Sequence, residues 1–523
     1  MQGFRRFLAN GLILTVTSLL MRGIGVAFNA FVNGKIGADG MGLFTLIMSV
    51  YGLAVTMASS GVNLAAVRMC AEAIGAEDDA RLRASLRRCL AYAVICGTAT
   101  ALALYAGADW VAADWLGDSR CAPSLRLLAL SLPFIAASNV LSGYFSAVRR
   151  VSKNAATQMF EQLFKIFVTV WALLYLVPDG IEYACMAIVG GGALAETASF
   201  TMALVLYLHD RHVHGAKGGY LPPDAGPKLT RTLFGITIPV AAAAYVRSGL
   251  TTLEHILIPR GLRANPLTAD TALATYGVLC GMVMPVIMFP TAFLYSFTGL
   301  LVPEFAEANS RADNQRIGNM TSRAMSMTLF YSVGCAEVMS CFSHELGMLI
   351  YQSSDAGLFI RIMAPLIPVM YLDHCIDAIL KGMGEQLYSM KVNILDAALC
   401  TLLVWLLCPR IGIWGYVLTV YLSELVNASL SLARLLKVCD FQVRVADWLL
   451  KPLVCVSGAI SLVRLGMDTL GWGMSWPTAI VGMTAAALLY TALLAVTGGL
   501  RLRGGYRSTD ARHPRRQPDG RRT

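Results

Sequence analysis

Two arginines lie inside stretches of the chain that are apolar enough to cross a bilayer. Arg22 lies near the centre of the stretch that begins at Phe7, and Arg247 lies in one that begins near Thr232. A charge at that depth costs at least about 2.5 kcal/mol on insertion scales, so each arginine is expected to face a polar cavity or a partner group. A guanidinium presents a planar fork of N–H donors that matches phosphate oxygens, so these positions predict recognition of a phosphorylated headgroup. The alternative for Arg247 is a buried ion pair with Glu254, which follows on the same predicted helix.

A second group of polar residues lies on the predicted helix 155–177. Glu161 and Lys165 are four residues apart and therefore share one helical face. They either neutralise each other or, with the neighbouring glutamines, form a polar stripe that contacts a sugar or assists a gate. The complete set of predicted substrate-binding residues is Arg22, Asn29, Gln158, Glu161, Lys165, Arg247 and Glu254.

Acidic residues inside other apolar stretches are candidates for coupling transport to an ion. Asp373 and Asp377 share a helical face, and two carboxylates this close favour holding one proton between them, which suits proton or sodium coupling. The alternative is a solvated helix end at which an aspartate pairs with Lys381. Glu337 is a third candidate, because a lone acid in an apolar stretch is functional or paired by default.

Other chemistry is not supported by the sequence. There is no Gly-x4-Gly-Lys-Ser/Thr motif for ATP, no nucleophile–base constellation that points to an enzyme, and no Cys-x-x-Cys pair among the thirteen cysteines. His209, His212 and His214 lack a fourth ligand nearby, so we predict no metal site and no cofactor apart from a coupling Na⁺ or H⁺. The net charge of +10 is concentrated in alternate loops and the C-terminal tail. This is the positive-inside pattern of a membrane protein and argues against a nucleic-acid partner.

The elements that must position these residues are membrane-spanning helices. The chain has 523 residues, 56% of them hydrophobic and 14% charged, against about 25% charged in soluble domains. Apolar segments of about 20 residues predict an all-α polytopic membrane protein with about fourteen transmembrane helices and both termini cytoplasmic. We expect two six-helix lobes around a central cavity, residues 1–210 and 232–440, joined by a cytoplasmic linker, 211–231. Two further helices, 441–500, and a disordered basic tail, 501–523, complete the chain.

A weak internal repeat relates the two predicted lobes. Arg22 follows Leu8 by fourteen residues, and Arg247 follows Leu233 by fourteen, each in the first helix of its lobe. Parallel repeats of this kind are found in transporters, where the two halves enclose one binding site. The spacing therefore predicts that both arginines face the shared cavity.

Seven short motifs follow one another in order through residues 5–440. They are SLLMRGIG at 18–25, GADGMGLF at 37–44, LIPR at 257–260, TYGVLCGMVMP at 275–285, FP at 289–290, LVPEF at 301–305 and LKGMGEQ at 380–386. Together they resemble the stage V sporulation protein B family of the multidrug/oligosaccharidyl-lipid/polysaccharide exporter superfamily, which includes MATE-like exporters and lipid II flippases. The resemblance implies a fourteen-helix, two-lobed transporter that moves a polyprenyl-linked sugar by alternating access. The chain departs from the family pattern at Asn29, near which relatives often carry a second basic residue, and this leaves the lipid II substrate open.

The leading hypothesis is a transporter of the bacterial cell membrane. It would flip a polyprenyl-pyrophosphate-linked oligosaccharide, or a peptidoglycan precursor such as lipid II, from the cytoplasmic to the outer leaflet during cell-wall or polysaccharide biosynthesis or sporulation. Its partners would be this lipid-linked substrate and the membrane lipids, and we expect it to act as a monomer. Two alternatives stay open: a sodium- or proton-coupled drug or cation antiporter of the same superfamily, and a non-transporting scaffold for envelope assembly. A flippase requires a wide, cationic cavity that opens laterally to lipid, whereas an antiporter requires a smaller cavity dominated by acids.

Overall fold

The chain is built from membrane-spanning helices. The computed structural model describes residues 2–76, 78–148, 150–175, 181–213, 225–265, 271–441, 446–471 and 475–497. Within these ranges nine helices are long and apolar enough to cross a membrane, and up to twelve spans result if each bent pair counts as one. The helix α1 (Gln2–Ser59) also bends at Gly37 into two arms, and the more polar α6 (Val151–Tyr175) is 25 residues long. The expected all-α polytopic fold is confirmed, with nine to twelve candidate spans among the described residues where about fourteen were predicted.

The first half of the chain contributes seven α-helices. After α1 come α2 (Val62–Gly75), α3 (Asp79–Trp110), α4 (Ala122–Ala129), α5 (Leu132–Ala147), α6 and α7 (Ile181–Val213). Two short turns, η1 (Val111–Leu116) and η2 (Ser119–Cys121), connect α3 to α4. Most of the predicted linker, 214–224, lies outside the described residues, as does the tail from 498 onward.

The second half begins with α8 (Ala225–Ala264) and contains several broken spans. The helices that follow are α9 (Ala272–Tyr276), η3 (Gly277–Val283), α10 (Met284–Met288), α11 (Thr291–Ser310), α12 (Asn314–Cys341), α13 (Ser343–Tyr351), α14 (Ser354–Met363), η4 (Ala364–Leu366), α15 (Ile367–Gly382), α16 (Gln386–Ile411) and α17 (Ile413–Val438). The chain ends in η5 (Ala446–Leu450), α18 (Lys451–Thr469) and α19 (Trp476–Val496).

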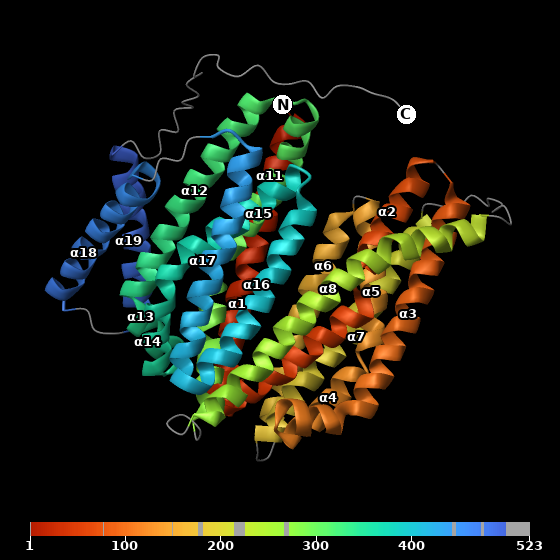
Figure 1. Cartoon of the computed structure of the whole chain (residues 1–523), viewed down its shortest axis with the longest axis horizontal. Coiled ribbons are helices and arrows are strands. Elements are labelled where there is room, and N and C mark those ends of the chain that lie inside the picture. Colours follow the sequence, from red (N-terminus) through yellow and green to blue (C-terminus); the bar gives the residue numbers. More distant parts are fainter. Residues whose placement is uncertain are drawn as a thin grey trace.

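The helices gather into two groups that separate toward one end of the molecule. Figure 1 shows α11 to α17 on one side, which we call the C-lobe, with α18 and α19 packed on its outer face. The helices α2 to α7 form the other group, the N-lobe. We call the end at which the N-terminus lies the terminal end, and the opposite end, at which α1 bends, the Gly37 end. The ribbons of the two lobes diverge toward the terminal end (Figure 1).

The long helix α8 crosses from one lobe to the other. Its first half packs on the N-lobe, where the Thr237 backbone leaves no room for a side chain at Gly61. Its second half packs on α16, where the Thr401 hydroxyl donates to the Leu250 carbonyl at 3.1 Å. The sequence predicts α8 as the first helix of the second lobe, whereas the structure places it across both.

The Gly37 end is closed by backbone packing between α1 and the α9–η3 segment. A side chain on Gly42 would meet the Leu273 carbonyl at 2.2 Å, and one on Gly277 would meet the Ala38 carbonyl at 2.1 Å. Glycine is the residue that lets two helix backbones approach this closely within a membrane. This contact, which we call the glycine seam, holds the two halves of the chain together at the end away from the termini.

The glycine seam generates the first prediction. Gly42→Ala should lower the midpoint of thermal unfolding of the purified protein, because overpacking of a tight contact costs about 1–3 kcal/mol. Gly52→Ala on the same helix is the matched control, because a side chain there meets nothing within 4 Å. Equal midpoints for the two variants would show that the seam is not closely packed.

Candidate functional site

Arg22 is held at a break in the helix that faces it. The span bends by 53° between the α9–α10 segment and α11, at Phe289–Pro290. Helix ends leave carbonyl groups without intrahelical partners and carry partial negative charge. The Met288 carbonyl at the end of α10 accepts a hydrogen bond from Arg22 Nη1 at 2.8 Å, and the same nitrogen donates to the Thr291 hydroxyl at 2.6 Å. The guanidinium also lies over the ring of Tyr295, 5.0 Å from its centroid.

A polar cavity of about 1000 Å³ lies beside Arg22. Its walls come from α1, α5, α6, α7 and α10, and it extends to Asn154 in the first turn of α6. Five of the seven residues predicted to bind substrate line it: Arg22, Asn29, Gln158, Glu161 and Lys165. Gln162, Asn139 and Asn154 add further amide groups. The lining therefore offers many uncharged donors and acceptors around a few charges, which suits a sugar.

The carboxylates of this cavity are held by hydroxyl groups. Glu161 accepts a hydrogen bond from the Ser199 hydroxyl at 2.8 Å, and Glu196 accepts one from the Tyr51 hydroxyl at 2.6 Å. The ion pairs found among the described residues do not include Glu161 with Lys165, although the two are four residues apart. The Lys165 ammonium is thus available to the cavity, on the α6 wall, while Arg22 lies on α1.

An apolar cavity of about 1080 Å³ adjoins the polar one. It lies between α1, α10, α11, α12 and α19, and Val26 and Phe289 line both cavities. The helix α11 presents a different face to each environment. Thr291 and Tyr295 contact Arg22, whereas Phe293 and Phe297 line the apolar cavity. A polar and an apolar compartment of similar size therefore meet close to one arginine.

Arg247 and Glu254 do not line either cavity. Arg247 is exposed on α8, and its charge acts on Asp396 of α16. Glu254 also lies near Asp396, and no ion pair joins Arg247 to Glu254 among the described residues. The matched spacing of Arg22 and Arg247 does not place them on one surface, because α8 runs obliquely between the lobes instead of facing the polar cavity.

Glu337 lies apart from the other two predicted ion-coupling residues, Asp373 and Asp377. Asp373 accepts a hydrogen bond from Asn427 of α17 at 3.0 Å, whereas Asp377 pairs with Lys381 at 2.5 Å near the end of α15. Glu337 of α12 accepts a hydrogen bond from Ser457 of α18 at 3.3 Å. The i,i+4 spacing does bring Asp373 and Asp377 to adjacent turns, but the partner of Asp373 comes from α17, whereas that of Asp377 is on α15 itself.

Two further acids of the C-lobe emerge from the structure. Asp396 accepts a hydrogen bond from Ser423 at 2.5 Å, and the charges of Asp373 and Asp396 both act on Glu424. These acids form a group between α15, α16 and α17. The sequence shows each of them as a single acid in an apolar stretch. It does not show that the helices that carry them pack together. Among the described residues, no three His, Cys, Asp or Glu side chains are grouped so as to hold a metal ion.

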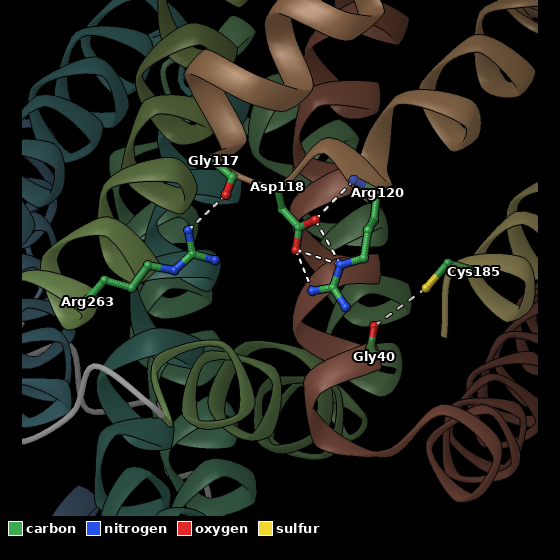
Figure 2. A network of polar contacts seen from close by, with 6 residues as sticks. All are labelled: Gly40, Gly117, Asp118, Arg120, Cys185 and Arg263. Atoms are coloured by element: carbon green, nitrogen blue, oxygen red, sulfur yellow. Dashed lines mark hydrogen bonds and ion pairs between the residues drawn. The ribbon is translucent and has the colours of Figure 1, made fainter. Parts of the chain in front are cut away.

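A polar network at the Gly37 end joins the two halves of the chain. In Figure 2, Arg263 at the end of α8 donates to the Gly117 carbonyl at 3.2 Å, and Asp118 accepts two hydrogen bonds from Arg120 Nε, at 2.9 and 3.1 Å. Gly117 has a φ of 68°, which favours glycine, and a side chain there would come within 3.0 Å of Arg263. Burial opposes ionisation of Asp118, but hydrogen bonds from Arg120 and the charges of Arg120 and Arg263 outweigh it and hold its pKa below the usual range.

These features define the class of protein: a polytopic membrane protein with the two-lobed fold of a transporter and a cavity between helices of both halves. The sequence signature of the polysaccharide biosynthesis protein family matches residues 7–309, and that of the MatE family matches residues 263–406. The first match spans more than half of the chain. The chain therefore belongs to the polysaccharide biosynthesis protein family, within the MOP superfamily of exporters, and the predicted family resemblance is confirmed.

Several characterised proteins are similar over most of their length. Stage V sporulation protein B of Bacillus subtilis (strain 168) is 25% identical over 495 residues, which cover 94% of this chain and 95% of that protein. Lipid II flippase MurJ of the same organism is 19% identical, over 96% of this chain and 95% of that protein. A solved structure of lipid II flippase MurJ in an inward closed conformation matches with a TM-score of 0.65 at 12% identity, over 94% of this chain and 100% of that one. An inward-facing multidrug resistance MATE family transporter matches with a TM-score of 0.64 at 12% identity, over 81% and 98%.

The network at the Gly37 end generates the second prediction. Because the pKa of Asp118 is lowered in the folded protein, its contribution to stability is present above the ordinary aspartate pKa of about 4 and is lost as the pH falls through the lower, folded value. Asp118→Asn should therefore lower the unfolding midpoint at pH 7, and its difference from the unmodified protein should shrink below about pH 4. Thermal unfolding in detergent at several pH values measures this. A difference that stays constant down to pH 3 would contradict a role for the carboxylate charge.

Proposed function

We propose that this protein flips a polyprenyl-linked, phosphorylated sugar across the bacterial cell membrane. The observation that carries the proposal is the meeting of the polar and apolar cavities beside Arg22. A lipid-linked sugar has the same division, with a hydrophilic head, a phosphate junction and a long hydrocarbon tail. The phosphate would lie at Arg22, the sugar among the amides of the polar cavity, and the first isoprenes in the apolar cavity.

The energetics favour this placement over the reverse. Each buried CH₂ contributes about 0.8 kcal/mol, so an isoprenoid chain favours the apolar cavity or the lipid itself. A phosphate requires charge-assisted hydrogen bonds before it can leave water, and guanidinium N–H groups supply them. Lys165 on the opposite wall offers a second cation for a pyrophosphate. The substrates named for the similar lipid II flippase fit this pattern of head and tail.

The direction of transport is proposed from the distribution of charge. Basic residues crowd the loops on the side of the termini, which is the cytoplasmic side under the positive-inside rule. The polar cavity extends toward that end, while the glycine seam and the Asp118 network close the other. The substrate would therefore enter from the inner leaflet and leave after the Gly37 end opens.

Coupling to an ion is proposed to use the acids of the C-lobe. Asp373, Asp396 and Glu424 lie near one another, and acids that have only neutral partners within a membrane are expensive to ionise unless they bind a proton or a cation in turn. H⁺ would fill this role, or Na⁺ with ligands beyond these three acids, since they are not grouped so as to hold a metal ion by themselves. The same acids are the observation that favours the alternative, an ion-coupled drug or cation antiporter.

The third prediction concerns Arg22. Arg22→Ala should reduce flipping of lipid II, or of undecaprenyl-pyrophosphate-linked sugar, by about 100-fold in proteoliposomes, because it removes charge-assisted hydrogen bonds worth about 1.5–3 kcal/mol. Arg22→Lys should retain part of the activity, since it keeps the charge but loses the planar fork.

Arg361→Ala is the matched control, because Arg361 is exposed on α14 and lies outside both cavities, so its loss should leave headgroup binding unchanged. Normal flipping by Arg22→Ala, at equal protein level in the vesicles, would remove the main support for a flippase. Drug efflux retained by that variant would favour the antiporter instead.

A further inference from the structure

A continuous row of polar and aromatic groups leads from Arg22 along the C-lobe. Tyr295 of α11 lies under the Arg22 guanidinium, and the His374 ring meets the Tyr295 ring edge-on with centroids 4.3 Å apart. The Thr298 hydroxyl, one turn further along α11, is 3.5 Å from His374 Nε2. Each of these groups is in contact with the next, so the row extends the Arg22 surface from α1 and α11 to α15.

The row continues to the terminal end along one face of α15. His374, Asp377 and Lys381 are separated by three and four residues, so they lie above one another on the helix. The opposite face of α15 is buried in a cluster that includes Cys375 and Ile379. Figure 1 shows α15 running from the Gly37 end, near α14, to the terminal end. Lys381 therefore lies near the mouth of the molecule, and Arg22 lies deeper.

The members of this row are accessible to a ligand. Tyr295 is 49% exposed although it lies next to a charged side chain, and the Lys381 side chain is 45% exposed. His374 is half-buried and lies within electrostatic reach of both Arg22 and Lys381. A partly exposed lysine ammonium, an imidazole N–H and a tyrosine hydroxyl each provide a donor for an anion along this row.

We propose that Tyr295, His374 and Lys381 form a headgroup approach site, which holds the phosphate of a polyprenyl lipid between the terminal end and Arg22. The inference rests on the proposed function and adds a second phosphate position to it. Lys381 would meet the phosphate first as a point charge. His374 would then donate a ring N–H to a phosphate oxygen. Tyr295, which lies between His374 and Arg22, would contact the headgroup before it reaches Arg22.

Asp377 competes with a phosphate for Lys381, and this competition makes the proposed site testable. Its carboxylate pairs with Lys381 at 2.5 Å and is itself only 18% exposed, so it offsets part of the lysine charge. A phosphate at Lys381 must compete with this carboxylate. Removal of the Asp377 charge should therefore tighten phosphate binding, whereas a lysine that serves only to pair with Asp377 predicts no such gain.

The test is binding of undecaprenyl phosphate to the full-length protein in nanodiscs, with undecaprenol as the probe that lacks the phosphate. His374→Gln and Lys381→Met should each weaken binding of undecaprenyl phosphate about fivefold to tenfold and leave undecaprenol binding unchanged. Asp377→Asn should strengthen it by a few-fold. Lys391→Met, which removes an exposed lysine near the start of α16 at the same end, is the charge-matched control and should have no effect.

Several outcomes would overturn the proposal. Unchanged affinity in His374→Gln and Lys381→Met, or equal losses for undecaprenol and undecaprenyl phosphate, would show that the residues are structural. Displacement of the lipid by an equal concentration of inorganic phosphate would show that the site takes a free anion rather than a lipid headgroup. If Arg22→Ala weakens binding while the His374 and Lys381 variants do not, only the approach site fails. If the unmodified protein does not bind undecaprenyl phosphate at all, the proposed function fails as well.

Discussion

The hydrocarbon core of a bilayer contains no water that could hydrogen-bond to a charge or to a free backbone carbonyl. In this structure one contact between α1 and a broken helix satisfies both kinds of group. The break at Phe289–Pro290 gives the Met288 carbonyl a position outside a regular helix, and Arg22 donates to it. Each group thus satisfies the other at a depth where neither tolerates lipid. The broken helix also divides the environment, since its two faces border different cavities. The candidate site therefore depends on the helix break at Phe289–Pro290 and on Arg22, which hydrogen-bonds to the carbonyl that the break leaves free.

The intramembrane acids follow the same constraint in a different way. Glu161, Glu196, Asp373, Asp396 and Glu337 each accept a hydrogen bond from a hydroxyl or amide on another helix. Such bonds tie helices together within each part of the molecule without forming ion pairs. Because these acids accept hydrogen bonds from neutral donors, the proposed function assigns the basic groups beside the polar cavity to an anionic ligand.

The sequence allowed the fold to be predicted, since apolar length and the placement of basic residues determine the number of spans. It also indicated a polar environment for Arg22 and the α6 stripe, because a charge inside an apolar stretch requires a polar neighbour, and in the structure both line one cavity. It did not predict the location of Arg247, which lines neither cavity. Equal spacing of two residues along two helices does not determine the path that each helix takes through the fold. Nor did it predict that Asp373 accepts a hydrogen bond from Asn427, which is distant in sequence, whereas the pair of Asp377 with Lys381 on the same helix was one of the two alternatives. The sequence did not indicate a role for Asp118, because an aspartate in a loop is ordinarily solvated. Its role depends on Arg263, which is distant in sequence and lies close to it only in the folded chain.

The two ends of the molecule are held by interactions of different character, and this has a consequence for alternating access. The Gly37 end combines backbone packing at the glycine seam with a polar network in a loop. Backbone packing is short-ranged, so a separation of a few tenths of an ångström already weakens it, whereas the ionic network acts over a longer distance. Opening of this end is therefore expected to begin at the seam and to end at Arg263 and Gly117. Under the proposed function, the helix α8, which packs on both lobes and carries Arg263 in its last turn, would be the element through which a change in the C-lobe acids reaches that last contact.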